Sequence, residues 1–172
     1  MKTLKETILE HLECPKLSIL ERLKINKDTK VVHYKYHPKD FDELRSLVKQ
    51  LLDERGPDAD LNDIDTSNVK RFYDPNKDLG LFRYLDPHNI KIDRWNTGRV
   101  VNMCDVFKWC ENFNCDLSNW DVSKVDTMCE MFFGCTSFTG KGLENWEHKN
   151  NCYKDHMFDG CTSFKNKPSW YK

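Results

Sequence analysis

Hydrophobic residues recur in the second half of the chain at a fixed interval of about 25 positions. Trp95, Trp120 and Trp146 keep this interval, and three other columns of residues share it. These columns are Phe107, Phe132 and Phe158; Phe113, Phe138 and Phe164; and Cys110, Cys135 and Cys161. Four columns in one phase predict a stack of similar units, each too small to bury its own hydrophobic face.

The pattern inside one unit predicts its secondary structure. Each unit starts with L-x-x-W-x-V, as at Leu117, Trp120 and Val122, which favours a short strand. The hydrophobic positions 125, 128, 132 and 135 follow at helical steps, and Gly134 suits the left-handed position that ends a helix, as does Gly160. We therefore expect an α/β fold, with a short strand plus a short helix in each coil. Residues 58–172 would form a short leucine-rich-repeat-like solenoid of about four coils, of which the first, from Leu61, is degenerate.

Residues 1–57 lack the repeat and are expected to form an α-rich N-terminal cap with one strand. Without a cap, the hydrophobic core of the first coil would be exposed to solvent at the end of the solenoid. Residues 30–38 are typical of a strand. Asp40 then opens an amphipathic helix that Gly56 ends. The apolar stripe of this helix consists of Phe41, Leu44, Leu47, Val48, Leu51 and Leu52.

One stretch carries a family resemblance. The segment FNCDLSNWDVSKVDTMCEMFFGC, from Phe113, resembles the BspA-type leucine-rich repeat of bacterial surface proteins and mycoplasma lipoproteins. That repeat reads approximately F-N-x-D-[LI]-S-x-W-[DN]-[TV]-S-x-V-x-x-M-x-x-M-F-x-G, and the resemblance covers about residues 60–166. It implies a leucine-rich-repeat fold. Since members of the family are mostly exported, and some are linked to adhesion, it also implies a surface or adhesion role.

Charge and composition narrow the classes of function. The 172 residues include 27 Lys and Arg and 28 Asp and Glu, so no basic field indicates nucleic-acid binding. Eight cysteines are few for a disulfide scaffold. No secretory signal and no apolar run of membrane length is visible. We therefore expect reduced cysteines, a cytoplasmic location (the host cytoplasm if the protein is phage-encoded), and no contact with nucleic acid or membrane.

Cysteine and histidine residues raise the alternative of a metal site or an enzyme. His148, Cys152 and His156 are four residues apart, and on one helix they could bind zinc together with Cys161. The repeat instead places His148 in the strand. No C-x-x-C pair and no nucleophile with an oriented base is visible. We expect the cysteine columns to fill the core, with no catalytic residue, metal ligand or cofactor.

The polar positions of L-x-x-W-x-V predict a binding surface, because stacking lines up equivalent positions of successive coils. One row, rich in acidic and amide side chains, consists of Asp65, Asn96, Asp121 and Glu147. The neighbouring row consists of Asp63, Arg94, Asn119 and Asn145. Residues 58–172 carry 18 acidic and 15 basic side chains. An acidic ladder on a regular surface suits another protein with a basic surface.

These observations favour a non-catalytic protein–protein interaction module. Its sharper version is a small intracellular inhibitor of a basic, nucleic-acid-handling host protein, as a phage could encode. Two alternatives remain open. One is the surface or adhesion repeat protein that the resemblance implies, and the other is a Cys/His metal-binding protein or enzyme.

Overall fold

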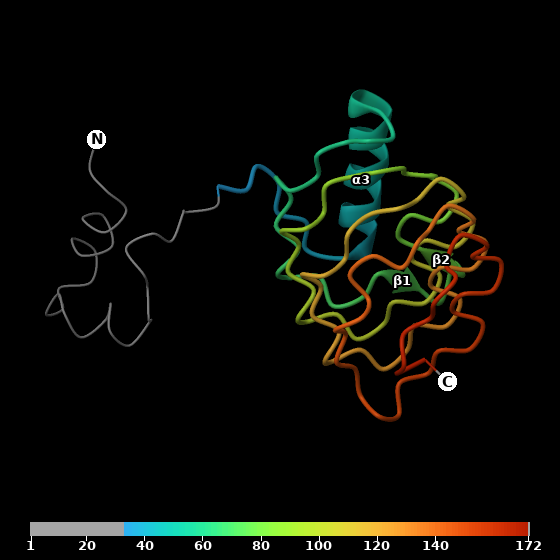
Figure 1. Ribbon diagram of the computed structural model, residues 1–172. Helices are drawn as coiled ribbons and strands as arrows, with labels where there is room; N and C mark the ends of the chain where they lie inside the picture. Colours follow the sequence, from blue (N-terminus) through green and yellow to red (C-terminus); the bar gives the residue numbers. More distant parts are fainter. Residues whose placement is uncertain (1–32, 172) are drawn as a thin grey trace, which may run out of the picture. The chain divides into compact units, whose positions relative to one another are not determined.

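A computed structural model describes residues 33–171. The chain divides into two units after His33, and the second unit, Tyr34–Lys172, holds the repeats. Residues 1–32 of the expected α-rich cap lie outside the described residues. The regular elements of the described part are helix α3 (Phe41–Arg55) and strands β1 (Tyr73–Asp74) and β2 (Leu79–Gly80), which pair antiparallel (Figure 1).

Helix α3 forms where the sequence predicts a helix. The Asp40 carboxylate accepts a hydrogen bond from the N–H of Glu43 at 3.0 Å, which satisfies one of the free donors of the first turn. Gly56 ends the helix with a φ of 84°. The buried face carries Phe41, Leu44, Val48 and Leu51, which join the core of the repeats. The strand predicted just before α3 is reduced to one parallel bridge, between Tyr36 and Ile64.

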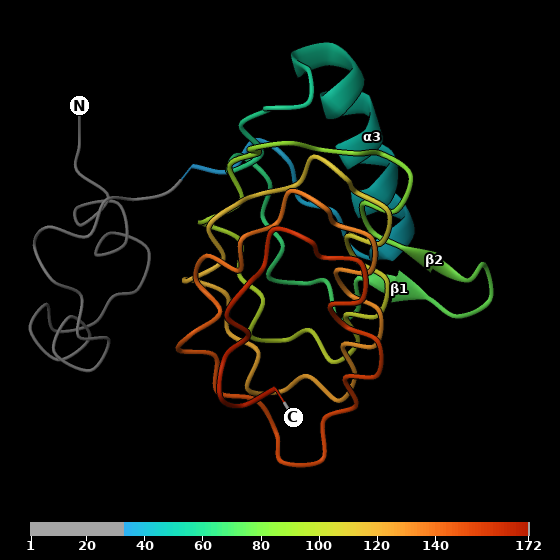
Figure 2. The ribbon, with the colours of Figure 1, turned by 45° about the vertical axis from the view of Figure 1, so that its right-hand side comes forward.

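After α3 the chain winds in successive loops, drawn from green to red in Figures 1 and 2. We call each loop that carries one copy of the repeat a coil. A row of single parallel bridges joins equivalent positions of adjacent coils: Arg71 with Asn102, Asn102 with Thr127, and Thr127 with Tyr153. Sequence positions about 25 residues apart therefore lie side by side. The assignment of this arrangement to the leucine-rich-repeat class stays a prediction.

Turns take the place of the short helix predicted in each coil. Over residues 128–135 alternate N–H groups bond to the next coil, and the N–H groups between them bond three residues back, as in turns. The N–H groups of Glu130, Phe132 and Gly134 donate to the carbonyls of Asp155, Met157 and Asp159, at 2.9, 3.0 and 2.8 Å. An α-helix would use these donors within the segment, four residues back. Gly134 and Gly160 do have positive φ, 75° and 78°, but they lie in turns.

The predicted strand of each coil is also replaced. Residues 117–122 form a turn and irregular backbone without strand pairing, and the bridges between coils lie further along, at Asn102, Thr127 and Tyr153. In residues 117–122 the backbone is held by turn bonds, such as the one from Trp120 N–H to the Leu117 carbonyl at 3.0 Å. These local bonds use groups that a regular ladder would need.

Aromatic rings from successive coils stack in the core. The Phe82, Phe107, Phe132 and Phe158 rings follow one another at centroid distances of 5.1, 5.5 and 5.6 Å, with interplanar angles of 12°, 13° and 12°. Offset stacking at such distances adds to the burial of apolar area. The regular interval of the phenylalanine columns therefore has a direct packing cause.

The tryptophan column is fixed by hydrogen bonds as well as by packing. Each indole N–H donates to the carbonyl of the first hydrophobic residue of the preceding coil. The pairs are Trp95 with Leu61 (2.9 Å), Trp120 with Ile92 (3.2 Å), Trp146 with Leu117 (3.1 Å) and Trp170 with Leu143 (2.8 Å). A buried indole N–H needs an acceptor, so tryptophan here sets the register between coils. Trp170 stacks on Trp146 at 6.2 Å and extends the column to the last coil.

Candidate functional site

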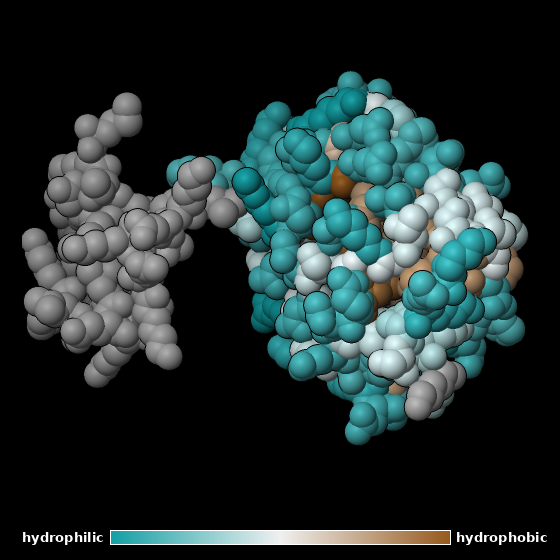
Figure 3. Space-filling model, viewed as in Figure 1, coloured by the Kyte–Doolittle hydropathy of each residue, from teal (hydrophilic) through white to brown (hydrophobic). Residues whose placement is uncertain are grey.

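The predicted partner-binding rows lie on consecutive coils, and most of their members are solvent-exposed. The exposed members are Arg94, Asn96, Asn119, Asp121, Asn145 and Glu147. Asn96 and Asp121 are close neighbours, because a Cβ atom at Gly98 would lie 3.6 Å from Asn96 Oδ1 and 2.8 Å from Asp121 Oδ2. Figure 3 shows that hydrophilic residues cover much of one face of the unit. The stack thus places polar groups at regular positions on its surface.

Three members of the first row also shape the backbone. The side-chain oxygens of Asp65, Asn96 and Asp121 accept hydrogen bonds from N–H groups two residues later, at 3.0, 3.2 and 2.9 Å. This is the Asx-turn geometry, which favours Asp or Asn at its first position. Hydrogen bonds from Ser123 hold the pKa of Asp121 below its usual value. The acidic and amide character of the row therefore has a structural cause, and Asp121 retains a second carboxylate oxygen.

Asp63 and Asp65 pair with residues of the segment before the repeats, and their part in partner binding stays a prediction. Asp63 accepts two hydrogen bonds from the Arg55 guanidinium, at 2.9 and 3.1 Å. Asp65 lies 3.3 Å from His37 Nδ1. Their side chains are only 30% and 20% exposed. Both carboxylates serve contacts between the cap and the first coil, so the exposed carboxylates of the rows are Asp121 and Glu147, on the third and fourth coils.

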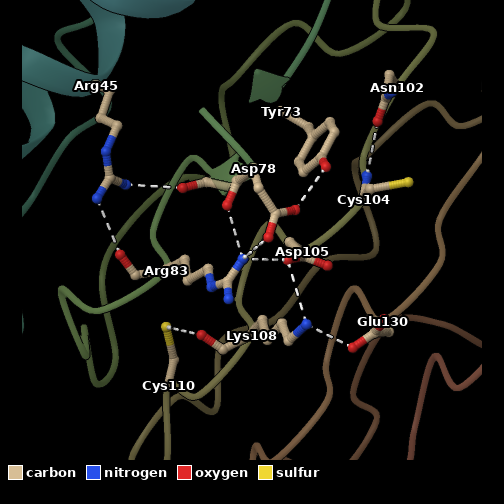
Figure 4. Close-up of polar contacts among 11 residues, drawn as sticks. Arg45, Tyr73, Asp78, Arg83, Asn102, Cys104, Asp105, Lys108, Cys110 and Glu130 are labelled. Carbon is tan, nitrogen blue, oxygen red and sulfur yellow. Dashed lines mark hydrogen bonds and ion pairs between the residues drawn. The ribbon is translucent and has the colours of Figure 1, made fainter. Parts of the chain in front are cut away.

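A second cluster, which sequence reasoning missed, joins charged residues from several coils (Figure 4). Arg83 Nη1 lies 2.7 Å from Asp105 Oδ2, and Lys108 Nζ lies 3.4 Å from the same oxygen. Lys108 also pairs with Glu130 at 2.5 Å. The side chains of Arg83, Asp105 and Lys108 are 11%, 8% and 15% exposed, so each charge depends on its partners. Burial raises the pKa of Asp105, although both cations oppose the rise.

Arg45 connects α3 to this cluster. Its guanidinium donates to the carbonyl oxygens of Gly80, Leu81 and Arg83, which lie in and just after β2 (Figure 4). One side chain thereby satisfies three carbonyls where the strand ends. The sequence contains a signal for part of the cluster, because Asp105 and Glu130 are one repeat apart and each is an acidic residue among apolar neighbours. The contribution of Arg45 had no signal in the sequence.

The cysteine column of the repeat lies in the core as hydrogen-bonded thiols. Cys110, Cys135 and Cys161 donate to carbonyls of the preceding coil, Phe82 O, Phe107 O and Phe132 O, at 3.3, 2.9 and 2.9 Å. The described cysteines are free. Burial raises the pKa of Cys115 to about 12 and that of Cys161 to about 11. The thiolate is the reactive form of cysteine, so burial holds these residues in the less reactive thiol form.

The histidines and cysteines of the last coil do not converge. His148 Nδ1 contacts the carbonyl of Lys149 at 2.8 Å, whereas His156 pairs with Asp159 at 2.8 Å. Within residues 33–171, no group of three or more His, Cys, Asp or Glu side chains is arranged to hold a metal ion. Among the described helices, none has the length and apolar character that crossing a membrane requires.

The carboxylates predict how stability depends on pH. Hydrogen bonds and cations lower the folded-state pKa of Asp63, Asp65, Asp116 and Asp121. Their contributions are present above the unfolded pKa, about 3.9, and are lost as the pH falls through the folded values. Asp105, with its raised pKa, has the opposite sign but is a single group. We therefore expect a falling melting temperature below about pH 4, measured by circular dichroism.

The substitution Asp63→Asn provides the control for this pH dependence. Asparagine keeps the shape but does not titrate, so the variant should be less stable at neutral pH and should lose less stability on acidification. A melting temperature that stays constant from neutral pH down through the aspartate range would contradict the expectation.

One protein-family model matches most of the chain. The family model described as "Mycoplasma protein of unknown function, DUF285" matches residues 46–171. The match includes most of α3 and all the coils, which agrees with their packing in one unit. No curated protein and no solved structure matches the chain. The chain belongs to the DUF285 family of Mycoplasma proteins of unknown function.

Proposed function

We propose that the protein is a non-catalytic protein–protein interaction module built as a short leucine-rich-repeat-like solenoid of the BspA type. The solenoid assignment is supported by the parallel bridges, the phenylalanine stack and the indole hydrogen bonds, all with the period of the repeat. The BspA-type assignment is supported by the motif from Phe113. Such stacks present extended surfaces made of equivalent positions, which suit recognition of another macromolecule.

The observation that carries the proposal is the fixed, exposed polar row on the second to fourth coils. Asn96, Asp121 and Glu147 are exposed, and the tryptophans at positions 95, 120 and 146 anchor each neighbouring backbone through an indole hydrogen bond. Groups that are already rigid lose little conformational freedom on binding. Two carboxylates and an amide at regular spacing complement a partner surface rich in lysine and arginine, and raise the rate and specificity of association.

Charge reversal tests the proposal. The partner is first captured from the native cell and identified, and its affinity for the purified chain is then measured by calorimetry. The double substitution Asp121→Lys and Glu147→Lys should weaken binding by about tenfold or more, because it replaces attraction by repulsion. Asp53→Lys on the exposed side of α3 is the control and should leave the affinity unchanged. Equal affinity of the double variant and the control would refute the role of the row.

The identity of the partner also separates the two cellular roles. The inhibitor of a basic host protein and the surface or adhesion protein both stay predictions. A cytoplasmic, nucleic-acid-handling partner supports the first, and an extracellular partner supports the second.

A further inference from the structure

Two aromatic side chains are exposed at equivalent positions of adjacent coils. Tyr84 is 67% exposed and Trp109 is 46% exposed, and they are one repeat apart. Both have positive φ, 68° and 63°. The next two coils have Gly134 and Gly160 at this position, with φ of 75° and 78°. Figure 3 shows an area of intermediate hydropathy on the side of the unit where Figure 1 places β2.

The backbone at this position favours glycine. A positive φ brings the Cβ atom of an L-residue close to its own backbone, and a bulky residue there is an outlier. Glycine avoids this cost, as the third and fourth coils show. The first two coils instead hold large rings that remain partly in water. An unfavourable conformation that is kept for an exposed aromatic side chain indicates a role beyond the packing of the turn.

Packing within the chain accounts for part of each ring. The Trp109 ring lies over Gly134, where an added Cβ atom would be 2.6 Å from Trp109 Cε3, and it meets the Phe133 ring edge-on at 4.9 Å. The Arg83 guanidinium lies 5.0 Å from the centroid of the Tyr84 ring. Tyr84 and Trp109 are 67% and 46% exposed with these contacts in place, so both rings have surface that a ligand can reach.

The charges around the two rings favour a cationic ligand. The cations next to them, Arg83 and Lys108, point inward, are at most 15% exposed and pair with Asp105. Carboxylates also occur in the corresponding turns of the four coils. Of these, Glu111, Asp155 and Asp159 are exposed, and Asp86 and Glu130 are half-buried. Glu130 already pairs with Lys108, and Asp159 pairs with the exposed His156. An approaching group therefore meets exposed aromatic surface and, at Glu111 and Asp155, exposed carboxylates, while Arg83 and Lys108 are largely buried.

We infer that Tyr84 and Trp109 form an aromatic docking site for arginine or lysine side chains of a protein partner. A cation over an aromatic face is attracted by the ring quadrupole, and the surrounding carboxylates add to the attraction. Trp and Tyr are also the residue types that dominate the energetics of many interfaces. The inference rests on the proposed function, which it deepens by naming a second contact surface for the same basic partner.

An NMR titration of the full chain with an oligoarginine peptide tests the site. We expect saturable shifts of the Trp109 indole N–H resonance, and none with an oligoglutamate peptide. Trp109→Gly should weaken binding by about tenfold, whereas Trp109→Tyr should keep most of it. The glycine variant is chosen because the next two coils have glycine with the same backbone conformation, so the fold should persist. Its spectrum and melting curve check this.

The outcomes separate this inference from the proposed function. If oligoarginine shifts resonances only near Asp121, or binds the Trp109→Gly variant with unchanged affinity, the aromatic site is refuted while the polar row stands. If the Trp109 resonance shifts as expected but charge reversal at Asp121 and Glu147 leaves the natural partner bound, the aromatic site stands and the row is refuted. A titration that moves no resonance refutes the aromatic site.

Discussion

Replacing Phe132 by alanine is expected to lower the free energy of unfolding by about 3–5 kcal/mol. The Phe132 ring is fully buried and stacks between Phe107 and Phe158 at 5.5 and 5.6 Å. It also lies 4.3 Å from the Phe138 ring. Its removal leaves a cavity between coils whose backbones are fixed by hydrogen bonds, so the site cannot collapse freely. Urea denaturation of the full chain, followed by circular dichroism, measures the change.

Tyr153→Ala is the matched control for this substitution. Tyr153 is an aromatic residue of the next coil, but it is 67% exposed, so its loss should change stability by less than about 0.5 kcal/mol. A loss of 3–5 kcal/mol is a large fraction of the roughly 5–15 kcal/mol by which most domains are stable. If the two substitutions had equal effects, the stacked rings would not be the main source of cohesion between coils.

The sequence was sufficient to predict helix α3 and the contacts between aromatic residues of successive coils, because both depend on hydrophobic residues at regular intervals. The amphipathic pattern predicted α3, and its buried face is formed by Phe41, Leu44, Val48 and Leu51, as expected. The columns of Trp and Phe predicted which residues meet across coils, because identical positions in successive units have the same environment. Both signals are repeated many times along the chain, so single exceptions do not hide them.

The secondary structure within a coil could not be predicted in the same way. Apolar steps of three and four residues suit a helix, but they also suit consecutive turns that bury the same side chains. The choice depends on where the backbone N–H groups find acceptors, and here Glu130 and Phe132 find them on the next coil. A prediction made from one coil at a time does not include that neighbour.

The sequence also could not predict which charged residues of the binding rows are paired within the chain. Asp63 and Asp65 occupy row positions, yet Arg55 and His37, from the segment before the repeats, pair with them. The Asp and Asn residues of the row also serve Asx turns, so their character arises in part from local geometry. Sequence spacing predicts the row, but only the folded contacts show which of its members are paired within the chain.

Replacing Arg83 by methionine is expected to cost about 3–5 kcal/mol, because it leaves the Asp105 carboxylate buried with one weaker partner. Asp105 Oδ2 lies 2.7 Å from Arg83 and 3.4 Å from Lys108, and the Asp105 side chain is 8% exposed. Methionine keeps much of the apolar stem of arginine, so the loss reports on the charge. Urea denaturation gives the difference in the free energy of unfolding.

The double variant with Arg83→Met and Asp105→Leu separates the lost charge pair from lost packing. Removal of both partners should recover a large part of the stability, because the buried carboxylate that Arg83→Met leaves without its main partner is then absent. The exposed pair of Lys91 and Asp60, at 3.5 Å, is the surface control, and Lys91→Met should cost less than about 1 kcal/mol. Arg83 also donates a hydrogen bond to the Asp78 carbonyl at 2.8 Å and lies over the Tyr84 ring. If the double variant were as unstable as Arg83→Met alone, the cost would arise from these contacts and from the shape of the arginine, and the buried pair would contribute little to the stability of the stack.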